Sequence, residues 1–288
     1  MTDFISKSIE LTDKDFKTIS SYIEKTVGIR MPAEKRVMMQ SRLVNRLKAL
    51  GFKTFSDYID YAFHTDTSGN EIILLTDALT TNKTEFFREN DHFQYLSNAV
   101  LPELANRGVK IPNIWSAGCS SGEEVYTLSI VLREFMRIHR GAFNNYHLFA
   151  TDISTKVLDK AVNAVYDEAT VADIPLEQKK RYFLKSTDRT NPKVRVKPEL
   201  RSCVSFRRLN FMDPVYNINE TFNAIFCRNV LIYFDKPTQE AIISKLIRNL
   251  ETGGFLFLGH SETILSMNLP LETVAPTVYR KTESVQKL

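Results

Sequence analysis

A short turn holds the residues of this chain whose types and spacing could do chemistry. The apolar run that begins at Asn113 ends in small residues, two glycines, Gly118 and Gly122, and two acids, Glu123 and Glu124. An amphipathic helical pattern follows, which is typical of a strand, a tight turn and a helix N-terminus. That helix end attracts anions, but carboxylates already stand there. They would repel a pyrophosphate and accept a sulfonium, which favours S-adenosylmethionine over a dinucleotide; an ordinary acidic helix start explains the same residues.

A second apolar run ends on an acid, Asp152. An acid at the end of the second strand of an α/β sheet commonly binds ribose hydroxyls. The glycine fingerprint G-x-G-x-x-G is absent, and Asp152 lies farther from Gly118 than the roughly 20 residues of a dinucleotide fold. The first crossover therefore needs a long helix or an added loop.

The elements that must position these residues alternate along the chain. Strand-like and helical runs follow one another through residues 86–288, which predicts an open α/β sheet closed by Thr277–Arg280 as an antiparallel edge. From about 180 to 206, short β-prone runs between polar turns predict a small antiparallel insertion. Its middle run, Lys193–Val196, alternates valine with basic residues, as an exposed edge strand would.

Residues 1–85 show helical patterns and no convincing strand. Their helix starts include two candidate N-caps, Thr12 and Thr54. The second helix places Lys35, Arg42 and Arg46 within an arc of roughly 40°, and Leu50 on its apolar side. A solvated face is the usual explanation of such charges. A docking strip for an acidic partner helix is the other.

Composition limits the function classes. The 288 residues suffice for one large domain or two moderate ones, and the net charge of +4 does not demand nucleic acid. Three separated cysteines and five scattered histidines predict neither a disulfide framework nor a metal site. The start is no signal peptide, and no apolar run reaches membrane-spanning length. We expect a cytoplasmic protein that is not inserted in a membrane.

Five short blocks stand in a fixed order along the chain. They are Asn82–Arg88, Ser116–Glu124, Ala150–Ser154, Cys227–Phe234 and Gly259–Glu262. Over nearly its whole length the chain strongly resembles the CheR family, the chemotaxis receptor glutamate methyltransferases. The resemblance implies a Rossmann-like S-adenosylmethionine-dependent methyltransferase sheet with a small β insertion, preceded by an all-helical N-terminal domain. It also implies methyl esterification of glutamates on cytoplasmic chemoreceptor helices, with S-adenosylhomocysteine as the other product.

The resemblance implies roles for single residues as well. Arg88 and Tyr233 would face the reacting methyl group. The cofactor would be bound by Asn82, Thr84, Arg88 and Glu123 at its methionine end, Gly118 in the turn, Asp152 at the ribose, Asn210 and Phe211 at the adenine, and Arg228 and Asn229 below it. The face that Lys35, Arg42 and Arg46 share on the second helix, and not the resemblance itself, makes these three residues the candidates for docking the receptor to the N-terminal domain. Family members can tether a C-terminal receptor pentapeptide through glycines in the insertion loop, and Lys185–Pro192 here contains none.

The implied reaction needs no general base, because a glutamate with a pKa near 4.3 is ionised at neutral pH. A serine hydrolase is an alternative, since Gly118–Gly122 fits G-x-S-x-G and Ser120 could be joined by Asp213 or Asp235 and His260. The all-helical upstream region is unusual for that fold. A nucleic-acid methyltransferase would require a basic groove with stacking aromatics. A binding module without turnover is a third alternative, and it leaves Arg88 and Tyr233 unexplained.

Overall fold

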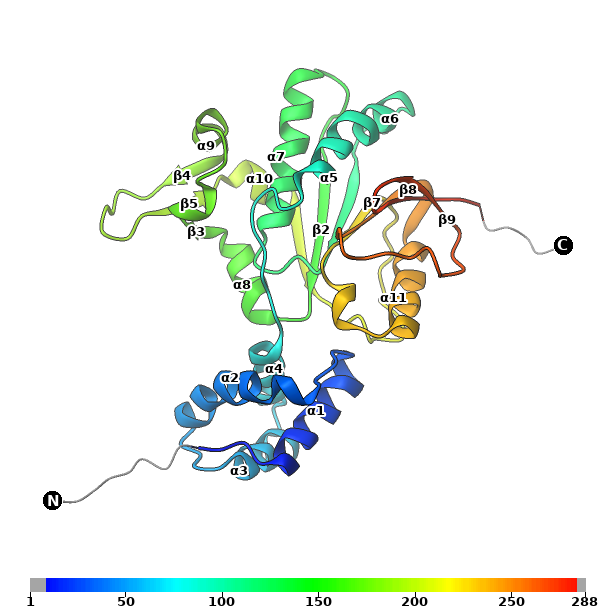
Figure 1. The fold of residues 1–288 in the computed structure, drawn as a ribbon. Coiled ribbons are helices and arrows are strands. Elements are labelled where there is room, and N and C mark those ends of the chain that lie inside the picture. The colour runs from blue at the N-terminus through cyan, green and yellow to red at the C-terminus, as the bar shows by residue number, and fades with distance from the viewer. Residues whose placement is uncertain (1–8, 284–288) are drawn as a thin grey trace. The chain divides into compact units, whose positions relative to one another are not determined.

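The computed structural model describes residues 9–283, and the chain divides into two compact units between Thr81 and Asn82 (Figure 1). We expected the boundary slightly later, after residue 85. The shift has a local cause, because the connecting segment is tied to the second unit. The Ser120 hydroxyl donates to the carbonyl of Asn82 over 2.9 Å, and the Phe87 N–H donates to the Thr127 hydroxyl over 3.1 Å.

The first unit is helical throughout its described residues, as predicted. Its helices are α1 (Asp13–Val27), η1 (Ala33–Lys35), α2 (Arg36–Ala49), α3 (Phe55–Asp60), η2 (Tyr61–Thr65) and α4 (Asn70–Leu79). Thr12 and Thr54 cap α1 and α3, because each hydroxyl accepts a backbone N–H three residues ahead over 3.1 Å. Leu50 was expected to join the buried face of α2, but it lies beyond the helix end and is 38% exposed.

The second unit is organised around a seven-stranded sheet with the order β6-β2-β1-β7-β8-β10-β9. The strands are β1 (Asn113–Ala117), β2 (His147–Asp152), β6 (Val204–Arg208), β7 (Phe222–Cys227), β8 (Leu250–Leu258), β9 (Leu271–Ala275) and β10 (Val278–Lys281). The first five in sheet order are parallel, and β10 is antiparallel to both of its neighbours, β8 and β9. The predicted α/β sheet is confirmed. The expected edge strand, β10, is instead flanked by β9, which the sequence did not indicate.

Helices cover both faces of this sheet (Figure 1). The helices of the second unit are α5 (Asn90–Tyr95), η3 (Leu96–Val100), α6 (Leu101–Asn106), α7 (Glu123–Ile138), α8 (Thr155–Asn163), η4 (Glu168–Val171), α9 (Leu176–Tyr182), α10 (Pro198–Arg201), η5 (Leu231–Tyr233) and α11 (Lys236–Arg248), of which η4 and α9 lie apart from the large sheet. Successive residues of β1, Ile114 and Trp115, enter different apolar cores, as strand alternation requires. No helix of the described chain combines the length and apolarity needed to cross a bilayer.

A small antiparallel sheet lies apart from the large one (Figure 1) and has the order β3-β5-β4. Its strands are β3 (Val165–Asp167), β4 (Phe183–Lys185) and β5 (Lys193–Val196). The predicted insertion is present with two differences: β3 precedes the expected start near 180, and the run at 204–208 belongs to the large sheet. β5 is the central strand and not an edge. Its alternation of valine with basic residues arises because one face of the strand is buried, with Val194 and Val196, and the other faces solvent.

Candidate active site

The carboxyl ends of four neighbouring parallel strands meet at one edge of the large sheet. β1 leads into the turn at Gly118, β2 ends on Asp152, β6 leads to Asn210 and Phe211, and β7 leads to Arg228. Ligands of open α/β sheets bind at this edge. The structure therefore brings together candidate residues that are far apart in the sequence.

The turn between β1 and α7 requires unusual backbone conformations. Gly118 and Gly122 have φ angles of 90° and 96°, and Ser120 between them has a φ of 49°. A Cβ atom on Gly118 would lie 2.5 Å from the Val230 side chain, and one on Gly122 would lie 2.9 Å from the Tyr166 hydroxyl. Glycine is therefore required at both positions, by conformation and by space.

Asp152 fastens this turn to the neighbouring strand. One carboxylate oxygen accepts the N–H of Ser120 over 2.9 Å, and the other accepts the N–H of Ser154 over 3.0 Å. The N–H of Gly118 donates to the carbonyl of Thr151 over 2.8 Å. The Asp152 side chain thus positions the turn, a role that sequence reasoning did not include.

Glu123, at the start of α7, is held by protein groups. Its carboxylate accepts a hydrogen bond from the Ser121 hydroxyl over 2.7 Å and lies 3.7 Å from the Lys160 ammonium. Only 4% of the residue is exposed. The helix start is therefore acidic, as the sequence suggested, but this carboxylate is fixed in place.

Arg228, which follows β7, is enclosed by acceptors. Its guanidinium pairs with Glu89 over 2.9 Å and with Glu124 over 3.2 Å, and it also donates to the carbonyl of Arg88. Its guanidinium carbon lies 5.1 Å from the centre of the Phe93 ring, within cation–π range. With 2% of its side chain exposed, Arg228 is a component of the protein interior.

The two carboxylates beside Arg228 differ in their electrostatics. Burial raises the pKa of Glu124, although the charge of Arg228 opposes the shift. Burial also acts to raise the pKa of Glu89, but hydrogen bonds from Asn229 and Arg228 outweigh it and lower that pKa below its usual value. Glu89 is therefore the more firmly ionised partner of the guanidinium.

Glu262 fixes the backbone that follows β7. Its carboxylate accepts N–H groups from Gly259 over 2.7 Å, Asn229 over 2.9 Å and Leu231 over 2.6 Å. The Asn229 side chain in turn donates to Glu89 over 3.0 Å. We call this connected set the buried network: Glu89, Glu124, Arg228, Asn229 and Glu262. Sequence reasoning assigned no role to Glu89 or Glu262, although both lie in or next to the recognised blocks.

A second set of candidate residues is partly exposed at the same edge. We call it the rim, and its members are Asn82, Thr84, Arg88, Asn210, Phe211 and Tyr233. The Arg88 guanidinium makes an exposed hydrogen bond to the carbonyl of Lys83 over 2.9 Å. Its neighbours Phe87 and Glu89 have positive φ angles of 56° and 52°, which non-glycine residues rarely adopt. The buried network holds this backbone through the bond from Arg228 to the Arg88 carbonyl.

Tyr233 lies in η5, directly after the residues that Glu262 holds. The Glu262 carboxylate accepts the N–H groups of Leu231 and Ile232, the first two residues of that turn. The buried network therefore positions the backbone of both Arg88 and Tyr233.

The residues of the hydrolase alternative are not assembled. The Ser120 hydroxyl donates to the Asn82 carbonyl, and no hydrogen bond joins it to His260 in the described structure. His260 pairs with Asp91 at 3.0 Å, and Asp235 caps α11. These contacts give each residue a structural role.

Glu89, His92 and His260 place ligand-type atoms within 4.8 Å of one another. Both oxygens of Glu89 already accept hydrogen bonds, from Arg228 and Asn229, and the guanidinium charge would repel a cation. Burial, with a smaller effect of the Arg228 charge, lowers the pKa of His92 to about 4. We assign this group to the structure of the site and to no metal.

The three basic residues of the first unit are partly engaged within it. Arg46 pairs with the buried Glu71 over 2.7 Å, and Arg42 donates to the carbonyl of Thr80, just after α4, over 2.9 Å. The Lys35 ammonium makes an exposed bond to the carbonyl of Arg30 over 2.9 Å. Two of the three therefore stabilise the helix packing, whatever else they contact.

Comparisons with known proteins match both units. Residues 14–80 match the family model described as the CheR methyltransferase all-alpha domain, and residues 82–280 match the CheR methyltransferase SAM binding domain. A chemotaxis protein methyltransferase of Borreliella burgdorferi is 37% identical, covering 95% of this chain and 96% of its own length. The protein of the same name from Salmonella typhimurium is also 37% identical, covering 96% and 92%. The chain belongs to the CheR methyltransferase family and carries its S-adenosylmethionine-binding domain.

Proposed function

We propose that this protein transfers the methyl group of S-adenosylmethionine to glutamate carboxylates on the cytoplasmic helices of chemoreceptors, releasing S-adenosylhomocysteine. The observation that carries the proposal is the position of Arg88 and Tyr233. Both are partly exposed on the rim, at the ligand-binding edge of the sheet, with their backbones fixed from below by the buried network. Membership of the family supports the reaction and the class of substrate.

The residues at the sheet edge fit the cofactor. The acidic start of α7 suits a cationic sulfonium and amine, and the mostly buried Asp152 carboxylate suits ribose hydroxyls. When bound, the cofactor supplies an electrophilic methyl group on a positively charged sulfur. We propose that its methionine end meets Asn82, Thr84, Arg88 and Glu123, its ribose meets Asp152 beside the Gly118 turn, and its adenine meets Asn210 and Phe211.

Arg228 and Asn229 receive a supporting role in this proposal. The Arg228 guanidinium faces Glu89, Glu124 and the Arg88 carbonyl, and the Asn229 amide donates to Glu89. In this proposal Arg228 and Asn229 lie beneath the cofactor and hold the backbone of the rim in place without reacting themselves.

The main requirement of the reaction is that the substrate carboxylate, the methyl group and the sulfur are aligned. The substrate carboxylate is already ionised near neutral pH, so no residue has to remove a proton. Arg88 and the Tyr233 hydroxyl would orient that carboxylate in line with the methyl group. Opposite charges cancel in the transition state, and exclusion of water by the rim would therefore favour the reaction.

Receptor docking is proposed for the basic face formed by Lys35, at the end of η1, with Arg42 and Arg46 of α2, and Lys35 is its least engaged member. Arg42 and Arg46 also contribute charge to that face. Arg42 donates to the carbonyl of Thr80, just after α4, and Arg46 donates to Glu71 within α4. The glycine-free loop Lys185–Pro192 gives no reason to propose a peptide tether at the small sheet.

A labelling experiment tests the proposed function. The full-length protein is incubated with methyl-tritiated cofactor and a purified receptor signalling domain. We expect label on the receptor that mild base releases as methanol, as an ester requires. Base-stable label would show methylation of another group, and reaction of Ser120 with a fluorophosphonate would favour the hydrolase instead.

A further inference from the structure

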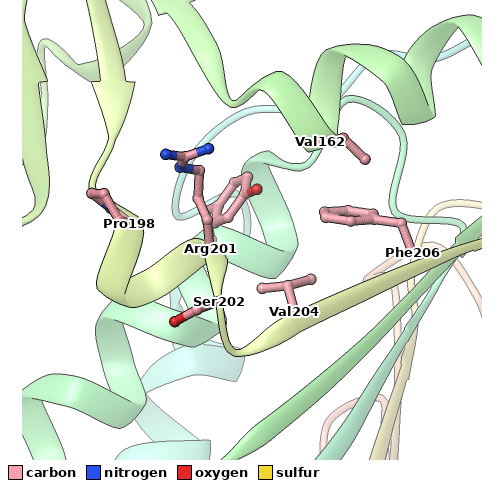
Figure 2. A pocket seen from close by; sticks show the side chains of 7 residues that line it. Val162, Pro198, Arg201, Ser202, Val204 and Phe206 are labelled. Carbon is pink, nitrogen blue, oxygen red and sulfur yellow. The ribbon is translucent and has the colours of Figure 1, made fainter.

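A hollow of about 360 Å³ lies beside the edge strand β6, formed by residues that have no part in the proposed reaction. Its walls come from α7, β6, the α10 region and the C-terminal turn of α8. Figure 2 shows Val204 and Phe206 projecting from β6 into the space between Arg201 and Val162. The hollow is open to solvent along the edge of the sheet.

β6 is the outermost strand of the large sheet, and one row of its backbone groups points away from that sheet. On the inner side, the Leu148 N–H donates to the Cys203 carbonyl over 2.8 Å, and the Leu209 N–H donates to the end of β2 over 2.9 Å. Backbone groups alternate in direction along a strand, so the odd-numbered residues face β2. The N–H and C=O groups of Val204 and Phe206 therefore face outward, and no described residue extends the sheet there.

Charged side chains commonly protect such an edge. β6 carries two of them, but both are used elsewhere. The Arg207 guanidinium donates to the Asn217 carbonyl over 3.1 Å and lies 5.6 Å from the Phe149 ring centre. The Arg208 guanidinium donates to the Ile153 carbonyl over 3.0 Å. The charged side chains of β6 itself therefore do not guard the segment around Val204 and Phe206.

Arg201 places a positive charge in the hollow that no carboxylate of the described chain neutralises. Its Nε–H is buried and has no hydrogen-bond partner. A buried donor without a partner is unfavourable, so an acceptor that reaches the guanidinium from the open side of the hollow would be stabilised there. On the opposite wall Val162 is 51% exposed, which offers an apolar contact.

We infer that this edge docks an extended, acidic segment of a partner protein as an additional strand on β6. Residues i and i+2 of a strand point the same way. One apolar side chain of the segment fills the hollow beside Val162 and Phe206, and an aspartate or glutamate two positions away meets Arg201. The backbone of the segment pairs with Val204 and Phe206, as in other strand-addition complexes. This surface acts independently of methyl transfer.

Capped pentapeptides test the inference with the full-length protein. The probes are Thr-Leu-Thr-Glu-Thr and Thr-Glu-Thr-Leu-Thr, which offer the same side chains in both strand directions, and versions with lysine in place of glutamate. Backbone amide resonances are followed by NMR during titration to millimolar concentration. We expect at least one acidic peptide to shift the Val204 and Phe206 amides, and the lysine versions to leave them unchanged.

Two substitutions complete the test. Arg201→Gln should weaken binding of the acidic peptide at least fivefold without lowering the melting temperature, because Arg201 has no partner to lose. Arg195→Gln is the matched control, since Arg195 is a neighbouring exposed arginine whose guanidinium donates to the Asn163 carbonyl outside the hollow. Its binding should equal that of the unmodified protein. Absence of shifts with both acidic peptides, equal shifts with the lysine peptides, or unchanged binding by Arg201→Gln would each overturn the inference.

Discussion

The buried network and the rim lie at the same edge of the same sheet, yet their side chains are held differently. Arg228 has 2% of its side chain exposed and contacts two carboxylates and a backbone carbonyl. Arg88, on the rim, makes one side-chain hydrogen bond within the described residues, to the exposed Lys83 carbonyl. One arginine is a fixed support, and the other can turn toward a ligand.

The difference follows from solvation. A charge removed from water must be compensated by an opposite charge and hydrogen bonds inside the protein, or folding becomes unfavourable. A partly exposed charge retains water and can exchange it for a substrate at small cost. Substitutions in the buried network should therefore affect stability first, and substitutions on the rim should affect rate first.

Arg228→Met should show the largest effect. It leaves Glu89 and Glu124 without their buried counter-charge, and breaking such a pair costs about 3–5 kcal/mol. The free energy of unfolding, measured with urea, should fall by that amount. Arg88→Met is the control and should change it by less than about 1 kcal/mol. Equal unfolding midpoints for the two variants would remove the distinction between network and rim.

Tyr233→Phe should have the next largest effect, on turnover alone. The substitution keeps the ring and removes the hydroxyl that we propose aligns the substrate carboxylate. A hundredfold fall in single-turnover rate corresponds to about 2.7 kcal/mol of transition-state stabilisation. Cofactor affinity by calorimetry should stay unchanged, and the urea midpoint should change far less than in Arg228→Met. A full rate with the phenylalanine variant would exclude the hydroxyl from the reaction.

The buried His92 should make the free energy of unfolding depend on pH. Burial is the main cause that lowers the pKa of His92 in the folded protein to about 4. As the pH falls, the unfolded chain therefore binds a proton at this residue before the folded chain does. The contribution of His92 is fully present above pH 6.5 and is lost as pH falls toward 4, by up to about 1.36 kcal/mol per pH unit. His92→Gln should have a shallower pH dependence of unfolding free energy in that window. The exposed His139→Gln should match the unmodified protein, and an equally steep slope in His92→Gln would contradict the assignment.

The first unit also contains both a basic side chain paired with a buried carboxylate and an exposed one. Arg46 contacts the buried Glu71, whereas Lys35, among the residues that the structure describes, makes only an exposed bond to a carbonyl. Lys35→Glu should raise the KM for receptor a few-fold at low salt without lowering stability, because exposed interface charges act mainly on encounter. Arg46→Glu should lower the melting temperature. Receptor kinetics unaffected by Lys35→Glu would mean that this face of α2 is only solvated.

Local patterns were sufficient to predict much of this structure. Thr12 and Thr54 cap helices as their sequence contexts indicate, because capping depends on residues within one turn. The glycines at 118 and 122 and the acid at Asp152 likewise belong to one strand-turn unit. These short-range signals predicted the sheet and the edge at which we propose its ligand site.

Long-range pairing was not predictable from the same patterns. Arg228 was expected below the cofactor, but nothing near it in the sequence indicates that Glu89 and Glu124 enclose it. Arg46 was expected on a charged outer face, and its partner Glu71 lies on another helix. The choice of partner depends on which helices pack together, which a helical period does not specify.

The central claim is that the rim aligns an already ionised glutamate and that no residue acts as a base. Single-turnover methyl transfer with receptor bound, measured from about pH 6 to 8.5, tests it most directly. The account predicts a nearly constant rate, because the nucleophile's pKa lies well below this range, and the same profile for His260→Ala. A rate that rises tenfold per pH unit and loses that slope in His260→Ala would contradict it.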